Sequence, residues 1–382
     1  MIVALGSGPQ GLRYHLDHAA DSIPARPRRP TAHVVAGLEV MSIFAREEMR
    51  ACLSFLGNLR PETSARIGIV LCFVSLLASG CGPTLWDARI EAGMGAYRQG
   101  RYAEAEKSWR AALEEAETSG RRDARRLARS LNNLGWLYGQ QGRLDEAEEF
   151  LTRARAVADP ALSITDRPVL AAILDNLGRL YHLQRRYAEA EPLLNRALEM
   201  REKMVSFLRK LEGFDHSAAV SETLLHLAEL YYDQRRHDEA EPLVLRSLKI
   251  RESALGADHP RVAENLHALG HVRERQGKLA EAETLFARSL AINEKALGPE
   301  HAQVAHDLHG LAAIYAARGE RERAEASYRR ALAIFEKTRG PEHHDVADTL
   351  EHLARLLRDS GREAEADSFD VRAKAIRAKR TP

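Results

Sequence analysis

The C-terminal half of the chain repeats itself every 42 residues. Alanine recurs at this step as Ala240, Ala282, Ala324 and Ala366. A leucine followed by a small residue, and a single glycine, keep the same step: Leu269-Gly270, Leu311-Ala312 and Leu353-Ala354, and Gly277, Gly319 and Gly361. A fixed period in this range is typical of stacked helical repeats, each of which buries a face on the next. We therefore expect an all-α fold and a chain that binds other proteins rather than one that performs chemistry.

The alanine position continues upstream at less regular spacing, as Ala105, Ala147 and Ala190. Together these positions indicate seven repeats over residues 85–382. Each repeat is expected to be a helix pair, with a glycine such as Gly142 where the first helix ends. A coiled coil would need sustained heptads without glycine turns, and the chain lacks them.

The segment 131–154 represents one repeat. Leu131, Leu134 and Tyr138 lie on one helical face, and their large-small pattern with Ala147 resembles that of a tetratricopeptide repeat. The connector after residue 254, LGADHPRVA, resembles the kinesin-light-chain type of this repeat. The resemblance implies a right-handed superhelical solenoid of about seven tetratricopeptide helix pairs over residues 85–382. It also implies that peptides or proteins bind in a concave groove, and it does not imply a motor complex.

In the family that the chain resembles, exposed positions on the first helix of each pair bind the ligand. The residues at these positions predict the groove, and asparagine among them can both donate to and accept from an extended peptide backbone. They are Asn132, Asn133, Trp136, Asp175, Asn176, Arg179, His226, Glu229, His267, His271, His306 and His309. The alternative is that these are solvated polar positions without a ligand.

Histidine is frequent in the repeats, with thirteen of the 16 lying between residues 182 and 352. His259, His301 and His343 in the connectors are interpreted as turns that cap the next helix, with a ligand role as the alternative. The pairs at 267/271 and 306/309 share helix faces at a spacing that can chelate zinc or copper. A histidine-rich metal-binding protein, or a groove that gains charge below pH ~6.5, is therefore an alternative function.

The N-terminal part of the chain has a different pattern. Residues 67–78 are apolar, too few to span a bilayer, and they follow Arg60 and Arg66. They end in Leu-Ala-Ser-Gly-Cys81, which resembles a bacterial lipobox with Cys81 as the lipidated residue. We expect residues 49–80 to be a lipoprotein signal peptide, 81–84 a lipidated N-terminus and short linker, and 1–48 an over-called, disordered upstream region. A buried helix on the first repeat is the alternative for 67–78.

This interpretation predicts an outer-membrane lipoprotein that faces the periplasm. Cleavage before Cys81 would leave no second thiol, so no disulfide is expected. The runner-up is a cytoplasmic adaptor of the same fold, in which residues 1–84 are not a signal.

The charge balance and the motifs of the chain argue against several classes of function. The chain carries 56 basic and 55 acidic residues, a balance that is unlike the basic face of a nucleic-acid-binding protein. The match to G-x-G-x-x-G at residues 6–11 lacks a β-α-β unit after it. No P-loop, nucleophile elbow or catalytic set is found. The sequence therefore predicts no enzyme, no cofactor and no small-molecule substrate, and proteins or peptides as partners.

Overall fold

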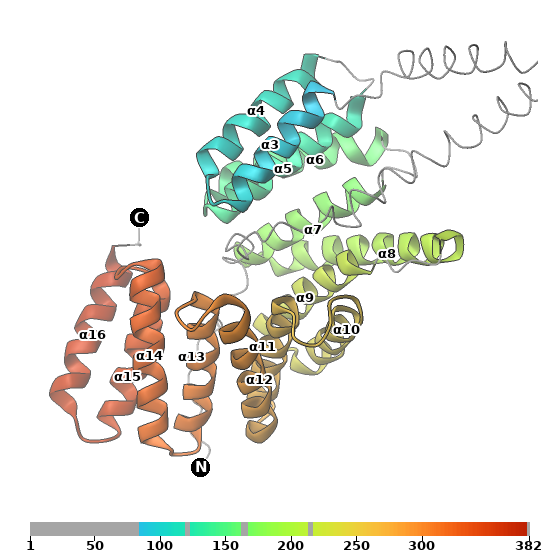
Figure 1. Cartoon of the computed structure of the whole chain (residues 1–382). Helices are drawn as coiled ribbons and strands as arrows, with labels where there is room; N and C mark the ends of the chain where they lie inside the picture. Colours follow the sequence, from blue (N-terminus) through green and yellow to red (C-terminus); the bar gives the residue numbers. More distant parts are fainter. Residues whose placement is uncertain (1–83, 119–122, 162–166, 213–216, 380–382) are drawn as a thin grey trace, which may run out of the picture. The chain divides into compact units, whose positions relative to one another are not determined.

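The computed structural model describes residues 84–118, 123–161, 167–212 and 217–379, which contain 14 α-helices in seven consecutive pairs (Figure 1). We call the first helix of each pair helix A and the second helix B. The pairs are α3 (Leu85–Arg98) with α4 (Tyr102–Thr118), α5 (Ala124–Gln140) with α6 (Leu144–Ala161), α7 (Arg167–Leu183) with α8 (Tyr187–Glu212), α9 (Ala218–Asp233) with α10 (His237–Leu255), α11 (Pro260–Arg275) with α12 (Leu279–Leu297), α13 (Ala302–Ala317) with α14 (Arg321–Arg339), and α15 (His344–Arg358) with α16 (Glu363–Ala378). The prediction of an all-α solenoid of about seven helix pairs is confirmed.

These helices fall into two compact units. The first contains α3 and α4 as far as Glu115, and the second contains the described residues from Ala116 onward. In the first, the indole of Trp109 is fully buried and donates from Nε1 to the carbonyl oxygen of Ile90 at 3.2 Å. A Cβ atom at Gly93 would lie only 2.2 Å from that nitrogen. The indole therefore packs directly on the backbone of α3, and a side chain at position 93 would collide with it, which explains why this residue is a glycine.

In the second unit, small residues let the two helices of a pair approach closely, as the sequence predicts. A Cβ atom on Gly135 would lie 2.6 Å from Cγ of Leu151 on the partner helix. Phe286 of α12 fits in the same way between Gly270 and Gly310, because a Cβ atom on either would lie within 3 Å of its ring. These glycines thus mark the points where a large side chain of a neighbouring helix packs directly on the backbone.

Most A helices end at a glycine with positive φ, as expected. These glycines have φ between 71° and 77°, and they are Gly100, Gly142, Gly277, Gly319 and Gly361. In α7 and α9 the position is held by Arg185 and Arg235, with φ of 60° and 62°, a conformation that is unfavourable for a residue with a Cβ atom. In each case the next arginine covers a tyrosine ring; the guanidinium of Arg186, for example, lies 3.9 Å from the ring centre of Tyr181. The same contact follows the glycine turn of α5, where the guanidinium of Arg143 lies 4.0 Å from the ring centre of Tyr138, so it belongs to the repeat and is not specific to these two turns.

The connector histidines cap the following helices, which confirms the capping interpretation. Nδ1 of His259, His301 and His343 accepts the backbone N–H two residues ahead, at 3.1, 3.2 and 3.3 Å. The longer segment between repeats 3 and 4 extends helix α8 to 26 residues, against 19 in α10, α12 and α14. The extra residues thus lengthen a B helix.

Each B helix in the second unit also packs against the A helix of the next pair. Successive A helices approach one another directly: α5 and α7, α7 and α9, α9 and α11, and α11 and α13. We call the side of the stack that α5, α7, α9, α11, α13 and α15 line the A-helix surface. In the part of the chain described above, no helix is both long and apolar enough to cross a membrane. The predicted signal peptide (49–80), the upstream region (1–48) and Cys81 lie outside the described residues.

Candidate functional site

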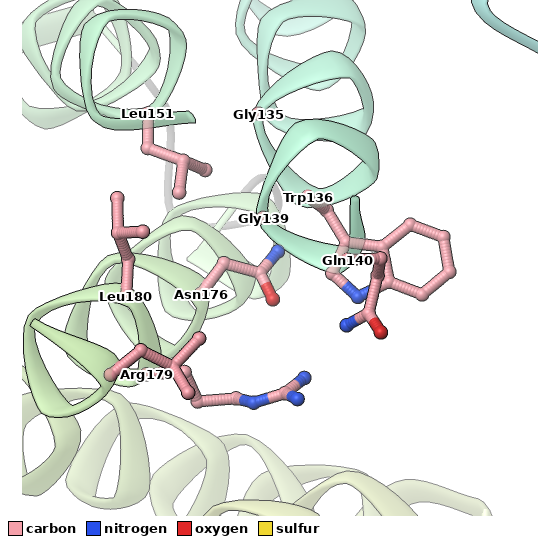
Figure 2. Close-up of a pocket in the computed structure, with 9 residues that line it drawn as sticks. Gly135, Trp136, Gly139, Gln140, Leu151, Asn176, Arg179 and Leu180 are labelled. Carbon is pink, nitrogen blue, oxygen red and sulfur yellow. The ribbon is translucent and has the colours of Figure 1, made fainter. Parts of the chain in front are cut away.

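A hollow lies between the A helices α5 and α7 (Figure 2). Its volume is about 290 Å³, counting the solvent at its open side. It is lined by nine residues, namely Gly135, Trp136, Gly139, Gln140, Leu151, Asn176, Arg179, Leu180 and Leu183. Leucines and the Trp136 ring supply apolar surface, while Gln140, Asn176 and Arg179 supply hydrogen-bonding groups. The structure therefore brings three predicted groove residues, Trp136, Asn176 and Arg179, into one site.

Two glycines create the space for this hollow. Gly135 admits the side chain of Leu151, as described above, which brings α6 close to α5. Gly139 lies one turn further along α5, and the nearest atom to a Cβ built there is 3.9 Å away. A side chain at Gly139 would enter the hollow, so the absence of one keeps it open.

Asparagine side chains link the two A helices beside the hollow. Nδ2 of Asn176 donates to Oδ1 of Asn132 at 2.9 Å, and both residues are half-buried, as is the neighbouring Asn133. The bond uses one donor of Asn176 and one lone pair of Asn132. Each amide thus keeps further hydrogen-bonding capacity, which a main-chain amide of an extended peptide could use.

A buried charged cluster follows between α7 and α9. The Asp175 carboxylate is 3.1 Å from Nδ1 of His226 and 3.6 Å from the guanidinium of Arg201. Burial alone would raise the pKa of Asp175, but the neighbouring charges of His226 and Arg201 hold it well below its usual range. Burial also lowers the pKa of His226. These residues join successive repeats rather than presenting themselves to a ligand.

Glu229 on α9 is the most perturbed acid of this region. It is 2% exposed, and its Oε2 atom has no hydrogen-bond partner among the residues that the structure describes. Burial raises its pKa to about 8, although the charge of Arg179 acts in the opposite direction. The carboxyl group is therefore protonated near neutral pH and can act as a donor.

The predicted histidine pairs differ from each other. Nε2 of His267 and Nε2 of His271 are 3.1 Å apart. The Nδ1 atoms of the same rings contact Asp307 at 2.8 Å and Glu274 at 3.1 Å. The two imidazoles thus belong to a chain of hydrogen bonds that links α11 to α13. Burial lowers the pKa of His271, so the expectation of added charge just below pH ~6.5 does not hold for this ring.

The two histidines of the second pair, His306 and His309, pack against different aromatic rings. The His306 ring lies 4.8 Å from the Phe335 ring, and the His309 ring lies 5.2 Å from the Tyr328 ring and 4.9 Å from the His352 ring. Burial holds the pKa of His309 well below its usual value. The two rings pack into the structure rather than together forming a chelating face.

The expectation of exposed positions along the whole groove is therefore wrong for five of the predicted residues. They are buried, at 6% exposure or less: Asp175, Glu229, His267, His271 and His306. The physical reason is that consecutive A helices cover each other, so polar groups there pair across repeats. The other predicted positions on helix A are half-buried: Asn132, Asn133, Trp136, Asn176, Arg179, His226 and His309.

Sequence reasoning did not assign six of the nine lining residues to the groove, and these six include Gln140 and Leu183. Gln140 follows Trp136 by four residues, and Leu183 follows Arg179 by four. The helical i, i+4 rule applied to the residues already chosen would have found both.

The comparisons with known proteins agree with this architecture. The family described as Tetratricopeptide repeat matches residues 87–159, 161–203, 219–295, 266–337 and 308–379. No curated protein matches the chain. Among solved structures, aspartyl phosphate phosphatase F from Bacillus subtilis is similar at 14% identity, over 99% of this chain and 95% of that one, with a TM-score of 0.56.

Two further solved structures are similar. The Rap conjugation gene regulator of plasmid pLS20, in complex with the Phr* peptide, shares 14% identity over 77% of this chain and 74% of its own, with a TM-score of 0.54. The kinesin-light-chain-type repeats of a Podosopora anserina protein share 27% identity over 57% of this chain and 98% of their own, with a TM-score of 0.46. At these values the likeness concerns the fold, while the family match extends over most of the sequence. The chain belongs to the tetratricopeptide-repeat family.

Proposed function

We propose that this protein is a scaffold that binds partner proteins or peptides on the A-helix surface, with the hollow between α5 and α7 as the anchoring point. The observation that carries the proposal is the hollow itself, where an exposed part of an indole and leucine side chains meet hydrogen-bonding groups. Such a combination suits one apolar side chain and the adjoining main chain of an extended peptide.

The fold adds support. Two proteins that are similar to this chain have been solved as complexes: a Rap protein with Competence and Sporulation Factor, and the pLS20 regulator with the Phr* peptide. Tryptophan and arginine dominate the binding energy of many interfaces, so Trp136 and Arg179 are the side chains we expect to contribute most.

The test is a selection of peptides on the purified full-length chain, followed by affinity measurements. Binding to Trp136→Ala or Arg179→Ala should weaken about tenfold or more, equivalent to about 1.4 kcal/mol. Arg330→Ala is the matched control, because this exposed arginine lies on a B helix, α14, and pairs there with Glu294. Equal affinity for all four proteins would refute the hollow as the binding site.

We also propose that the scaffold is attached to the outer membrane, facing the periplasm, through lipid on Cys81. The support is the sequence around Cys81, and stable attachment requires more than one acyl chain. Fatty-acid labelling and membrane fractionation of wild type and Cys81→Ser test this. A labelled wild type and an unlabelled variant are expected; an unlabelled wild type that keeps residues 1–80 in the cytosol would favour the cytoplasmic adaptor.

A further inference from the structure

The connector before α15 departs from the two connectors that match it in sequence. The three read Asp258-His259-Pro260-Arg261, Glu300-His301-Ala302-Gln303 and Glu342-His343-His344-Asp345. All three use the first histidine as a helix cap, as shown above. Only the last connector has a histidine and an aspartate after the capping histidine, and capping requires neither.

These added side chains gather around one carboxylate. Oδ1 of Asp345 is 3.3 Å from Nε2 of His344, and Oδ2 is 3.2 Å from Nδ1 of His343. One potential ligand atom from each of the three residues lies within 4.8 Å of the others. From the neighbouring helix α13, Nε2 of His306 approaches Oδ2 of Asp345 to 3.9 Å. Two successive repeats thus contribute to one cluster.

These separations suit a metal site. Zinc binds histidine nitrogen and carboxylate oxygen at 2.0–2.2 Å in a tetrahedron, so its ligand atoms lie roughly 3.3–3.5 Å from each other. Asp345 and His306 are 2% and 3% exposed, while the side chains of His343 and His344 are 21% and 29% exposed. The cluster is therefore held in the structure on one side and accessible to an ion from the other.

The Oδ1 atom of Asp345 gives independent support for a bound cation. This atom is buried and accepts no hydrogen bond among the described residues. A buried carboxylate oxygen without such a bond is costly, and a bound cation would satisfy it. The N-terminal end of α15 opposes a cation only weakly beside the affinity of a zinc site.

The pair His267 and His271 does not support a metal site in the same way. Both ring nitrogens of each imidazole already have partners at hydrogen-bonding distance, as described above. A metal ion there would have to displace an existing contact and would find two protein ligands. The cluster before α15 offers three side chains whose ligand atoms lie within 4.8 Å of one another.

We propose that His343, His344 and Asp345 bind one divalent transition-metal ion of the zinc type, with His306 beside Asp345 as a further ligand. Imidazole and carboxylate ligands together suit Zn²⁺, whereas Mg²⁺ and Ca²⁺ prefer oxygen ligands alone. His343 contributes least, because its Nδ1 atom already caps the helix. The ion would connect α13 to α15 and so hold the last helix pair to the repeat before it. The proposal is independent of the hollow between α5 and α7.

The test uses the full-length chain, stripped of metal with EDTA and titrated with Zn²⁺ in a calorimeter. The double variant His344→Ala/Asp345→Gln gives this connector the sequence Glu-His-Ala-Gln of the connector before α13, and it keeps the cap at His343. It also keeps the 15 other histidines, so any binding that remains reports those. Circular dichroism in EDTA checks that wild type and variant fold alike.

We expect wild type to bind one Zn²⁺ per chain and to melt at a higher temperature with Zn²⁺ than with Mg²⁺. The variant should bind Zn²⁺ about tenfold more weakly or worse and should show no such increase in melting temperature. His306→Ala should weaken binding as well, which would place the ion between α13 and α15. Absence of Zn²⁺ binding by wild type, or equal binding by wild type and the double variant, would overturn the proposal.

Discussion

The buried carboxyl group of Glu229 makes the stability of the second compact unit depend on pH in an unusual direction. Burial raises its pKa from an ordinary value of 4.5 to about 8. Between these two values the folded chain keeps a proton that the unfolded chain has released. The unfolded state then binds fewer protons, so the free energy of unfolding falls as the pH rises from about 4.5 to about 8.

The size of the effect follows from the same numbers. A difference of about 3.5 in pKa corresponds to at most about 5 kcal/mol, which is the full cost of ionising this carboxyl group in place. Glu229→Gln keeps the shape and the hydrogen-bonding groups of the protonated acid and cannot ionise. The variant should therefore match wild type near pH 4.5 and be more stable by up to about 5 kcal/mol near pH 9.

Urea denaturation of the full-length chain at pH 5, 7 and 9, followed by circular dichroism, measures this difference. Because a stack of repeats can open in segments, hydrogen exchange of the α9 amides gives a local measurement of the same quantity. Glu222→Gln is the matched control, since Glu222 is exposed on the same helix. A difference between wild type and Glu229→Gln that stays constant over this pH range would refute the reasoning.

Three other substitutions test separate parts of the fold. Gly135→Ala should destabilise the chain by about 1–3 kcal/mol in urea, because the new Cβ atom would meet Leu151 at 2.6 Å, whereas Gly139→Ala in the same helix should be neutral or stabilising by about 0.5–1 kcal/mol. His301→Ala removes a helix cap and should cost about 1 kcal/mol, seen as faster hydrogen exchange at the start of α13. Asp175→Asn should cost about 3–5 kcal/mol at pH 7; since the folded pKa of Asp175 is lowered, this loss should shrink as the pH falls below 3.8. A loss that is the same at pH 7 and pH 3 would contradict the assigned charge on Asp175.

The sequence predicts the backbone architecture in detail because a repeat displays each packing constraint several times. Gly142, Gly277 and Gly319 recur since each ends an A helix with positive φ. His259 and His301 recur because each caps the helix that follows. Where the chain departs, as at Arg185 and Arg235, it keeps the same backbone conformation without the glycine. A pattern of glycines alone does not predict a positive φ at an arginine.

The candidate site was harder to predict, because polarity alone does not separate a solvent-facing residue from one paired across repeats. His267 and Asp307 are 40 residues apart and are both buried, in contact at 2.8 Å. Asp175 and His226 behave similarly over 51 residues. Each member looks like an exposed polar position within its own repeat. The useful signal would have been complementary charge on consecutive A helices, which becomes visible only when neighbouring repeats are aligned in register.

The A-helix surface consequently has two chemical characters along the second unit. Between α5 and α7 the polar groups are amides with remaining hydrogen-bonding capacity and the guanidinium of Arg179, and glycine leaves room beside Trp136. From α9 to α13 the polar groups are buried histidines and acids that pair with one another, as at His267 and Asp307. A ligand that competes for those groups must break satisfied pairs in a low-dielectric environment, which is costly. At the proposed binding site, the amides of Asn132 and Asn176 keep hydrogen-bonding capacity that a ligand can use without breaking a buried ion pair, which favours recognition at α5 and α7 over the repeats that follow.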